Sequence, residues 1–439
     1  MDQVKDVIIT SEGVAPVKVV TVRSRWVRNL VWFLMVLGPG LIVMEADNDA
    51  GAVSTYTQAG AQYGTHLLWL MFLLLPVTYF IQEMVARLGI ATGQGHAAMI
   101  FKRFGKGWGL FSLVDLLVVN FLTLVTEFAA ISLALSALGV SPYIAVPLAA
   151  LGLIALVSTG KYLRWERITI GLCLLDVIWL VLALTAHPVS SQVLNGTLVV
   201  QVPPGGLTSN LVFLVIGIVG TTIAPWQLFF QQSCVADKKL RFADLKWARL
   251  DTFIGACFTI LVAAAMMLVG DASFRHHILF ADPAQMARAL GPVLGPFVRI
   301  AVPLLMVNAA VLGATAISLA SSWALSEVRG WKHSLQKSVR EAPKFYIVYG
   351  GCVAAAAGLV LIPGAPLQLI ILGVQVLAGV ILPSAIIFLQ LLLNDRELLG
   401  DEFVNKPWNN WVNWTIIVVL FILSFILAAQ TVAPRLFPS

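Results

Sequence analysis

The chain has 439 residues, of which 59% are hydrophobic and only 11% are charged. Soluble globular proteins carry about 25% charged residues, so this composition excludes a soluble fold and indicates an integral membrane protein. The formal net charge of +6 comes from basic loops between apolar segments. We therefore attribute it to membrane topology and expect no nucleic-acid partner.

Apolar runs of about 20 residues, the length that crosses a bilayer, recur along the whole chain. We predict eleven transmembrane segments: 28–62, 66–88, 109–137, 142–158, 166–186, 210–232, 249–270, 295–327, 346–363, 366–393 and 412–432. Short loops join them, so residues 28–432 are expected to form one transmembrane domain after a cytoplasmic tail, 1–27. With the N-terminus in the cytoplasm, 24 of the 28 Lys and Arg residues lie inside, which predicts a multi-pass protein of a prokaryotic plasma membrane.

The first segment is broken near its middle. It is apolar from Leu30 to Met44 and then reads "EADNDAG". Carboxylates at the bilayer centre cost about 3 kcal/mol or more each, so they normally face a cavity or a partner. Asp49 lies at the break, beside Gly51, and Glu45 would share a helical face with it. Asp47 turns inward only if the backbone unwinds.

The sixth segment is broken at the matching place. It is apolar from Leu211 to Ala224, and Pro225 then removes a backbone donor. Segments one to five (28–186) and six to ten (210–393) form two sets with an odd number of crossings each, so their orientations in the membrane are opposite. Interrupted helices at matching positions of two inverted halves indicate a binding site near the bilayer midplane.

Other oxygen ligands are available near these breaks. Thr221 and Gln227 lie in segment six, Glu127 lies deep in segment three, and Gln375 lies in segment ten. No histidine lies in the middle of a segment. Carboxylates, amides and carbonyls without thiolate or imidazole suit a hard divalent cation such as Mg²⁺, Ca²⁺ or Mn²⁺. The alternative, that the acids pair with basic residues, stays open, mainly for Glu45 and Asp47.

Other features narrow the function. Glu83 is expected to pair with Arg87 four residues later, and Asp115 and Asp176 are expected to make buried polar contacts. The sequence contains no P-loop and no G-x-S-x-G motif. We therefore expect neither an enzyme nor an ATPase partner, and no cofactor; the metal ion is cargo.

Four fragments resemble the NRAMP family of divalent-metal transporters: "GPG" at 38–40, "LLWL" at 67–70, "ARLGIATG" at 86–93 and "NDRELLGDEFVNKPW" at 394–408. The resemblance runs from about residue 30 to 430. It implies an all-α, LeuT-like fold with two inverted five-helix repeats, an additional eleventh helix, a cytoplasmic N-terminus and alternating access.

The resemblance also implies site residues. The family motif Asp-Pro-Gly-Asn corresponds to residues 49–52, so Asp49 is kept and Ala52 replaces the amide. The motif Met-Pro-His corresponds to residues 224–226, so Ala224 replaces the thioether and Trp226 the imidazole. Backbone carbonyl ligands would be those of Ala46 and Thr221.

The acid pair that the family uses in segment three becomes Glu127 and Ala130. Losing the thioether and two larger ligands leaves an oxygen-only, roomier site that suits partly hydrated Mg²⁺. This pattern resembles the NRAMP-related magnesium transporters, which implies uptake of Mg²⁺ and Mn²⁺ without obligatory proton coupling.

Other functions stay open at this point. The chain is alternatively a proton-coupled Mn²⁺/Fe²⁺ transporter of the NRAMP type, or an ion-coupled carrier of an organic substrate with the same fold. A channel and a membrane scaffold that transports nothing are further alternatives. The lipid bilayer and the divalent ion are the expected partners.

Overall fold

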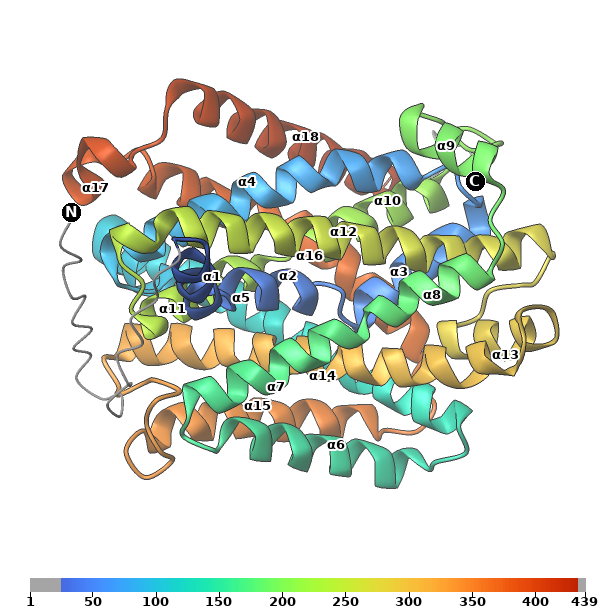
Figure 1. The fold of residues 1–439 in the computed structure, drawn as a ribbon, viewed down its shortest axis with the longest axis horizontal. Helices are drawn as coiled ribbons and strands as arrows, with labels where there is room; N and C mark the ends of the chain where they lie inside the picture. Colours follow the sequence, from blue (N-terminus) through green and yellow to red (C-terminus); the bar gives the residue numbers. More distant parts are fainter. Residues whose placement is uncertain (1–24, 433–439) are drawn as a thin grey trace.

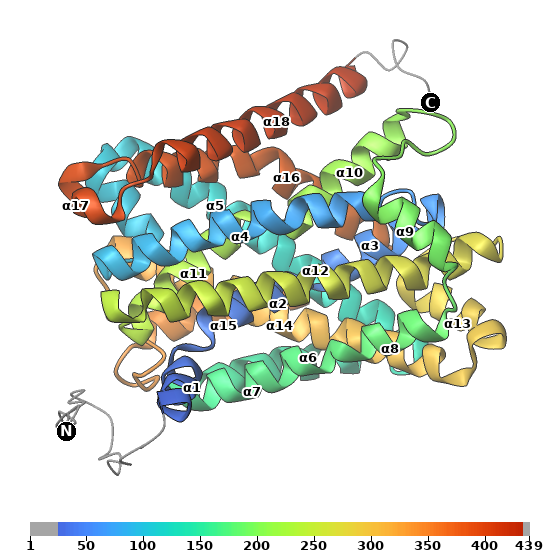
Figure 2. The ribbon, with the colours of Figure 1, turned by 45° about the horizontal axis from the view of Figure 1, so that its top comes forward.

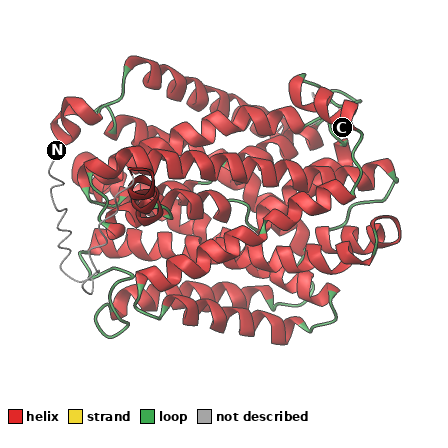
Figure 3. Cartoon of the chain, viewed as in Figure 1, coloured by secondary structure: helices red, strands yellow, loops and turns green. Residues whose placement is uncertain are grey.

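The structure is a computed structural model that describes residues 25–432, and all regular secondary structure in that range is helical (Figure 3). The first five crossings are α2 (Pro39–Ala46) with α3 (Ala50–Tyr63), α4 (Leu68–Thr92), α5 (His96–Ala137), α6 (Pro142–Val157), and α7 (Tyr162–Leu175) with α8 (Val177–Thr185). The next five are α10 (Ser209–Thr222) with α11 (Pro225–Lys238), α12 (Leu245–Arg275), α14 (Pro296–Arg329), α15 (Pro343–Val360) and α16 (Leu367–Leu392). The eleventh is α18 (Pro407–Val432), and the remaining helices are α1 (Arg25–Val36), α9 (Ser190–Leu198), η1 (Phe242–Asp244), α13 (Pro283–Leu294) and α17 (Arg396–Phe403).

The long helices lie side by side in one bundle (Figures 1 and 2). Among residues 25–432, nine helical stretches are long and apolar enough to cross a membrane, and α6 is a shorter apolar helix. The broken pair α2–α3 completes the predicted set of eleven crossings. The loops that follow α4, α11 and α14 lie at the end of the bundle where α1 lies, and α9 and α13 lie at the opposite end (Figure 1).

The predicted start of the first segment, at residue 28, is wrong. Helix α1 ends at Val36, and the chain turns at Leu37 and Gly38 before α2 begins. Gly38 has a φ of 144°, which residues with a side chain rarely adopt. In Figure 1, α1 points across the direction of the long helices. Hydropathy alone joined α1 to α2 because both are apolar. Most of the predicted tail, residues 1–24, lies outside the described residues.

Asp251 of α12 holds the N-terminus of α2. Its carboxylate accepts the backbone N–H of Gly40 at 2.7 Å, of Leu41 at 3.1 Å and of Gly38 at 3.3 Å. These N–H groups have no partner within their own helix, and the helix dipole favours a negative charge there. The inner half of the broken segment is therefore fixed to α12.

Close backbone contacts hold the outer half to the same helix. A Cβ built at Gly60 of α3 would lie 1.9 Å from the carbonyl oxygen of Met267, and one built at Gly270 of α12 would lie 2.2 Å from that of Thr57. Small residues allow such an approach between membrane helices. Helix α12 thus supports both sides of the break, so the unwound residues sit between two fixed ends.

Two expectations for isolated acids are confirmed. Glu83 pairs with Arg87, Nε to Oε1, at 3.3 Å, and also with Arg249 at 2.8 Å. Asp115 accepts a hydrogen bond from Ser384 at 2.8 Å. Each of these carboxylates has a partner within the protein, so we assign neither of them to an ion site.

Candidate functional site

Asp49 is the N-cap of α3, directly after the unwound residues. Its Oδ1 accepts the N–H of Ala52 at 2.9 Å. The N–H of Ala50 would close a turn on the Ala46 carbonyl in a continuous helix, but it donates to Glu127 Oε2 at 3.2 Å. The break therefore deprives the Ala46 carbonyl of its helical donor. This carbonyl oxygen is one that is expected from the sequence to bind the ion.

Glu127 of α5 meets Asp49 across the break. The two carboxyl groups are neighbours, and both side chains are at most 2% exposed. A Cβ built at Gly313 of α14 would lie 2.7 Å from Asp49 Cβ and 3.0 Å from Glu127 Oε2. Two carboxyl groups this close are stable only with a proton or a cation between them. The pair is thus able to hold a proton or a cation, and the space around it depends on a glycine from a third helix.

The second break frees a carbonyl oxygen in the same way. Helix α10 ends at Thr222, and Pro225 begins α11 after an extended Ala224. Pro225 has no N–H, so the Thr221 carbonyl has no donor four residues later. The Thr221 hydroxyl also has no hydrogen-bond partner although Thr221 is 1% exposed. Thr222 joins the two broken segments through a 2.7 Å hydrogen bond with Tyr56 of α3.

Gln375 of α16 lies between the two breaks. A Cβ built at Gly51 would lie 1.8 Å from its Nε2, and one built at Gly220 would lie 2.1 Å from its carbonyl oxygen. The Nε2 has no hydrogen-bond partner among the described residues. Gly51 thus makes room for the side-chain amide of Gln375 at the start of α3, where a water bound to an ion could accept its N–H, and Gly220 lets the backbone of α16 approach α10.

Asp47 turns toward the sixth segment. Its Oδ1 accepts a hydrogen bond from Gln227 Nε2, and Gln227 Oε1 accepts one from Gln82 of α4 at 2.8 Å. Asp47 Oδ2 is buried without a partner. The predicted ligands Asp47 and Gln227 thus contact each other, with no basic residue in this chain of contacts.

Glu45 lies elsewhere. Its Oε1 accepts a hydrogen bond from Thr259 of α12 at 2.9 Å, and its carboxyl group contacts that of Asp176. The break separates Glu45 from the helix that Asp49 begins, so the helical face that would join them does not continue. The structure brings Asp49 to Glu127, Gln375 to Gly51 and Asp47 to Gln227, but it places Glu45 with a different set of partners.

Trp226 lies in the first turn of α11, directly after Pro225. The indole is fully buried and packs edge-on against Phe230 at 6.2 Å between centroids. Phe230 in turn packs against Trp323 of α14 at 5.7 Å. An imidazole at position 226 would offer a ligand or a proton acceptor, whereas the indole N–H is only a donor. Ala52 in the first turn of α3 and Ala224 at the N-cap of α11, at 0% and 4% exposed, offer no side-chain ligand beside the two breaks.

The donor set contains few charged ligands. Among the described residues, no three His, Cys, Asp or Glu side chains converge closely enough to hold a metal ion. An ion at this site would therefore be bound by one or two carboxylates and by neutral oxygens. Mg²⁺ is bound in this way, because it keeps several of its waters.

Sequence reasoning missed three contributors: Gly313, Gln82 and Tyr56. Gly313 and Gln82 lie on apolar helices far from the breaks in sequence, whereas Tyr56 lies in α3, soon after Asp49. Gln82 carried a usable signal, since an uncharged amide deep in a membrane helix needs a partner. Gly313 and Tyr56 carried no such signal in the sequence, because small and aromatic residues are common on any packed membrane helix.

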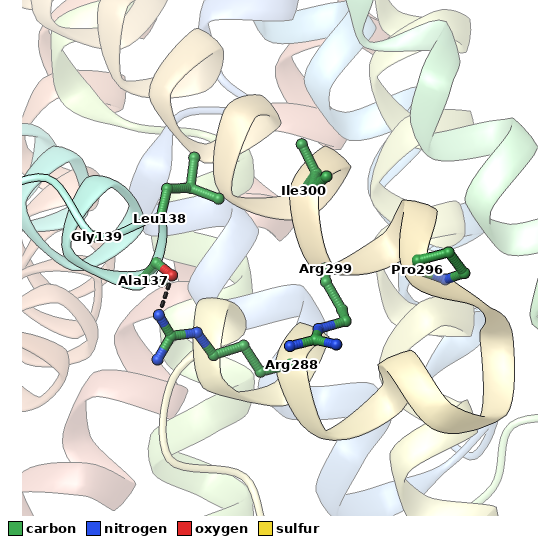
Figure 4. A pocket seen from close by; sticks show the side chains of 7 residues that line it. All are labelled: Ala137, Leu138, Gly139, Arg288, Pro296, Arg299 and Ile300. Atoms are coloured by element: carbon green, nitrogen blue, oxygen red, sulfur yellow. Dashed lines mark hydrogen bonds between the residues drawn. The ribbon is translucent and has the colours of Figure 1, made fainter.

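A cavity of about 580 Å³ opens at the opposite end of the bundle from α1, between α5, α13 and α14 (Figure 4). It is lined by Ala137, Leu138, Gly139, Arg288, Pro296, Arg299 and Ile300. Arg288 donates a hydrogen bond to the Ala137 carbonyl (Figure 4). Two guanidinium groups and no carboxylate line this cavity, so it does not attract cations and is separate from the candidate site.

Comparisons with known proteins show which family the chain resembles. A family model described as "Natural resistance-associated macrophage protein-like" (Nramp) matches residues 40–430. The divalent metal cation transporter MntH of Staphylococcus aureus (strain bovine RF122 / ET3-1) is 25% identical over 427 residues, covering 91% of this chain and 92% of that protein.

Solved structures show the same fold. The manganese transporter of Eremococcus coleocola, in complex with an aromatic bis-isothiourea compound, is 20% identical with a TM-score of 0.77, covering 98% of this chain and 92% of its own. MhsT in complex with L-phenylalanine is 13% identical with a TM-score of 0.57, and the match covers 92% of this chain and 99% of the MhsT chain. These likenesses confirm the expected LeuT-like arrangement.

Proposed function

The chain belongs to the Nramp family, and we propose that it is a divalent-metal transporter that takes up Mg²⁺ and Mn²⁺ by alternating access. The observation that carries the proposal is the meeting of Asp49, Glu127 and Gln375 at two interrupted helices, with alanine at 52 and 224. Relatives are named as divalent metal cation and manganese transporters. The oxygen-only donor set extends the range to the harder ion, Mg²⁺.

The test is ion flux into proteoliposomes that contain the purified protein. Mg²⁺ and Mn²⁺ should enter, and each should compete with the other because both use Asp49. Cd²⁺, a softer ion, should compete poorly, since the site offers no sulfur ligand. Flux of Mn²⁺ and Cd²⁺ without flux of Mg²⁺ would contradict the magnesium part of the proposal.

A second function is a proton-coupled Mn²⁺/Fe²⁺ transporter. One observation favours it: the Asp49–Glu127 pair lies at the centre of the site and is able to hold a proton when no ion is bound. The relatives' names also point to manganese. The two functions differ in what moves with the ion, which flux experiments resolve.

We expect that restoring an amide and a thioether with Ala52→Asn and Ala224→Met shifts preference from Mg²⁺ toward Mn²⁺ and Cd²⁺. The change in the flux ratio should be about tenfold, since one sulfur ligand need supply only about 1.4 kcal/mol of discrimination. Mg²⁺, Mn²⁺ and Cd²⁺ fluxes are measured on equal amounts of reconstituted protein. An active double variant with an unchanged ratio would show that these two positions do not set selectivity.

We also expect uptake without obligatory proton movement. A divalent ion gains about 4.6 kcal/mol per 100 mV, which suffices for accumulation of roughly a thousandfold without a proton. The measurement uses a pH-sensitive dye trapped in proteoliposomes, with the membrane potential clamped by an ionophore. Acidification that requires both Mg²⁺ and the protein, and persists under the clamp, would support the proton-coupled function instead.

A further inference from the structure

A second buried polar cluster lies beside the break, at the end of α2. We call it the inner cluster, and it joins α2 and the unwound residues to the α7–α8 junction, α12 and α14. Its side chains are between 0% and 7% exposed, and they are Glu45, Asn48, Asp176, Thr259 and Asn308. None of them contacts a basic side chain in any ion pair of the described residues.

The members of the inner cluster contact one another in a chain. Thr259 Oγ1 donates to Glu45 Oε1 at 2.9 Å, and Asn48 Nδ2 donates to the Thr259 carbonyl at 3.2 Å. Asn308 Nδ2 donates to Asp176 Oδ1 at 3.1 Å. The carboxyl groups of Glu45 and Asp176 are neighbours, and the Asn48 side chain lies near Glu45 as well. Two acids from different helices therefore face each other in an apolar bundle.

One oxygen on each of four side chains has no donor. These buried atoms are Glu45 Oε2, Asp176 Oδ2, Asn48 Oδ1 and Asn308 Oδ1. A buried acceptor without a partner costs about 1–3 kcal/mol, and more when it is charged. The donors of Thr259, Asn48 and Asn308 bond to other atoms, and two carboxyl groups this close are stable only with a proton or a cation between them. A cation meets that requirement.

The backbone at Asp176 is built differently from the helices around it. Its N–H donates to the Cys173 carbonyl at 3.2 Å, and its own carbonyl accepts the N–H of Trp179 at 3.0 Å. Both are bonds between residues three apart, so the helix tightens and divides into α7 and α8 at this residue. Such a turn inside a membrane helix, without proline or glycine, often marks a functional site.

We propose that the inner cluster is a second binding site for a hard divalent cation, beside the central site at Asp49. Two carboxylates match the charge of a divalent ion, and the neutral oxygens of Asn48 and Asn308 complete an oxygen-only donor set. Glu45 belongs to α2, whereas Asp176 lies at the α7–α8 junction and Asn308 lies in α14. A bound ion would therefore tie α2 to the rest of the bundle, and release would require their separation. The identity of the ion rests on the proposed function.

The test is the number of Mn²⁺ ions that the purified, full-length protein binds in detergent. Free Mn²⁺ is counted from its electron paramagnetic resonance signal, and Mg²⁺ is added as a competitor. We expect two equivalents for the unmodified protein, one for Asp49→Ala, one for Asp176→Asn, and none for the double variant. Glu45→Gln changes the other acid of the cluster, so it should also bind one equivalent, as Asp176→Asn does. Excess Mg²⁺ should displace both.

Asp115→Asn is the matched control, because it makes the same change at another intramembrane aspartate that contacts only Ser384 in the described structure. It should bind two equivalents. Size-exclusion chromatography confirms that each variant is folded. Two equivalents retained by both Asp176→Asn and Glu45→Gln would overturn the inner site, as would a single equivalent in the unmodified protein that Asp49→Ala removes. Loss in Asp176→Asn but not in Asp49→Ala would instead overturn the central site and the proposed function.

Discussion

Asp49→Ala is expected to lower Mg²⁺ and Mn²⁺ uptake into proteoliposomes by at least about 100-fold, which corresponds to the loss of about 3 kcal/mol of ion binding. Asp49 is the carboxylate at the end of the unwound residues, and it faces Glu127. Removing it leaves one acid and neutral oxygens for a doubly charged ion. Uptake is measured as initial rate per amount of reconstituted protein.

The folded state should survive this change. Asp49 caps α3 by one hydrogen bond to Ala52, and the loss of such a cap costs about 1 kcal/mol. Asp115→Ala is the control, since it removes a half-buried carboxylate of α5 that is bonded to Ser384 and should leave uptake near normal. Uptake by Asp49→Ala close to that of the unmodified protein would place the ion site elsewhere.

Gly313→Ala is expected to reduce uptake at least about tenfold while the protein remains folded. The added methyl group would lie 2.7 Å from Asp49 Cβ and 3.0 Å from Glu127 Oε2, too close for either atom to stay in place. Overpacking of this kind costs about 1–3 kcal/mol, and here the strain falls on the two acids themselves. The measurement is the same initial rate, with a thermal unfolding midpoint for each protein.

Gly358→Ala is the matched control. It makes the same substitution in a membrane helix, α15, where a Cβ would meet no atom within 4 Å. It should leave both uptake and thermal stability unchanged. Gly313→Val should lower uptake further than Gly313→Ala because the added volume is larger. If both Gly313 variants transport within about twofold of the unmodified protein, the acid pair does not bind the ion in the geometry described.

These two predictions differ in origin. The importance of Asp49 was predicted from a carboxylate and a glycine that interrupt an apolar run. The importance of Gly313 is evident only from the packing of α14 against the break. Both test the same centre, one by removing charge and one by removing space, so agreement between them would locate the ion without a structure of the bound state.

Local features of the sequence determined the membrane topology. Span length and the distribution of Lys and Arg depend only on stretches of about 20 residues, and the bilayer acts on each stretch alone. The eleven crossings, the two breaks and the pairing of Glu83 with Arg87 were predictable for this reason. Hydropathy failed at α1, because an apolar helix across the bundle and one along it have similar compositions.

The direction of each polar side chain was decided only by the tertiary structure. Glu45 and Asp49 lie four residues apart, yet Glu45 contacts Thr259 and Asp176 while Asp49 contacts Glu127. The unwound residues between them end the helical periodicity that would relate one face to the other. Which helices then supply partners depends on how α5, α8, α12 and α14 pack around the break, and no local stretch of sequence contains that information.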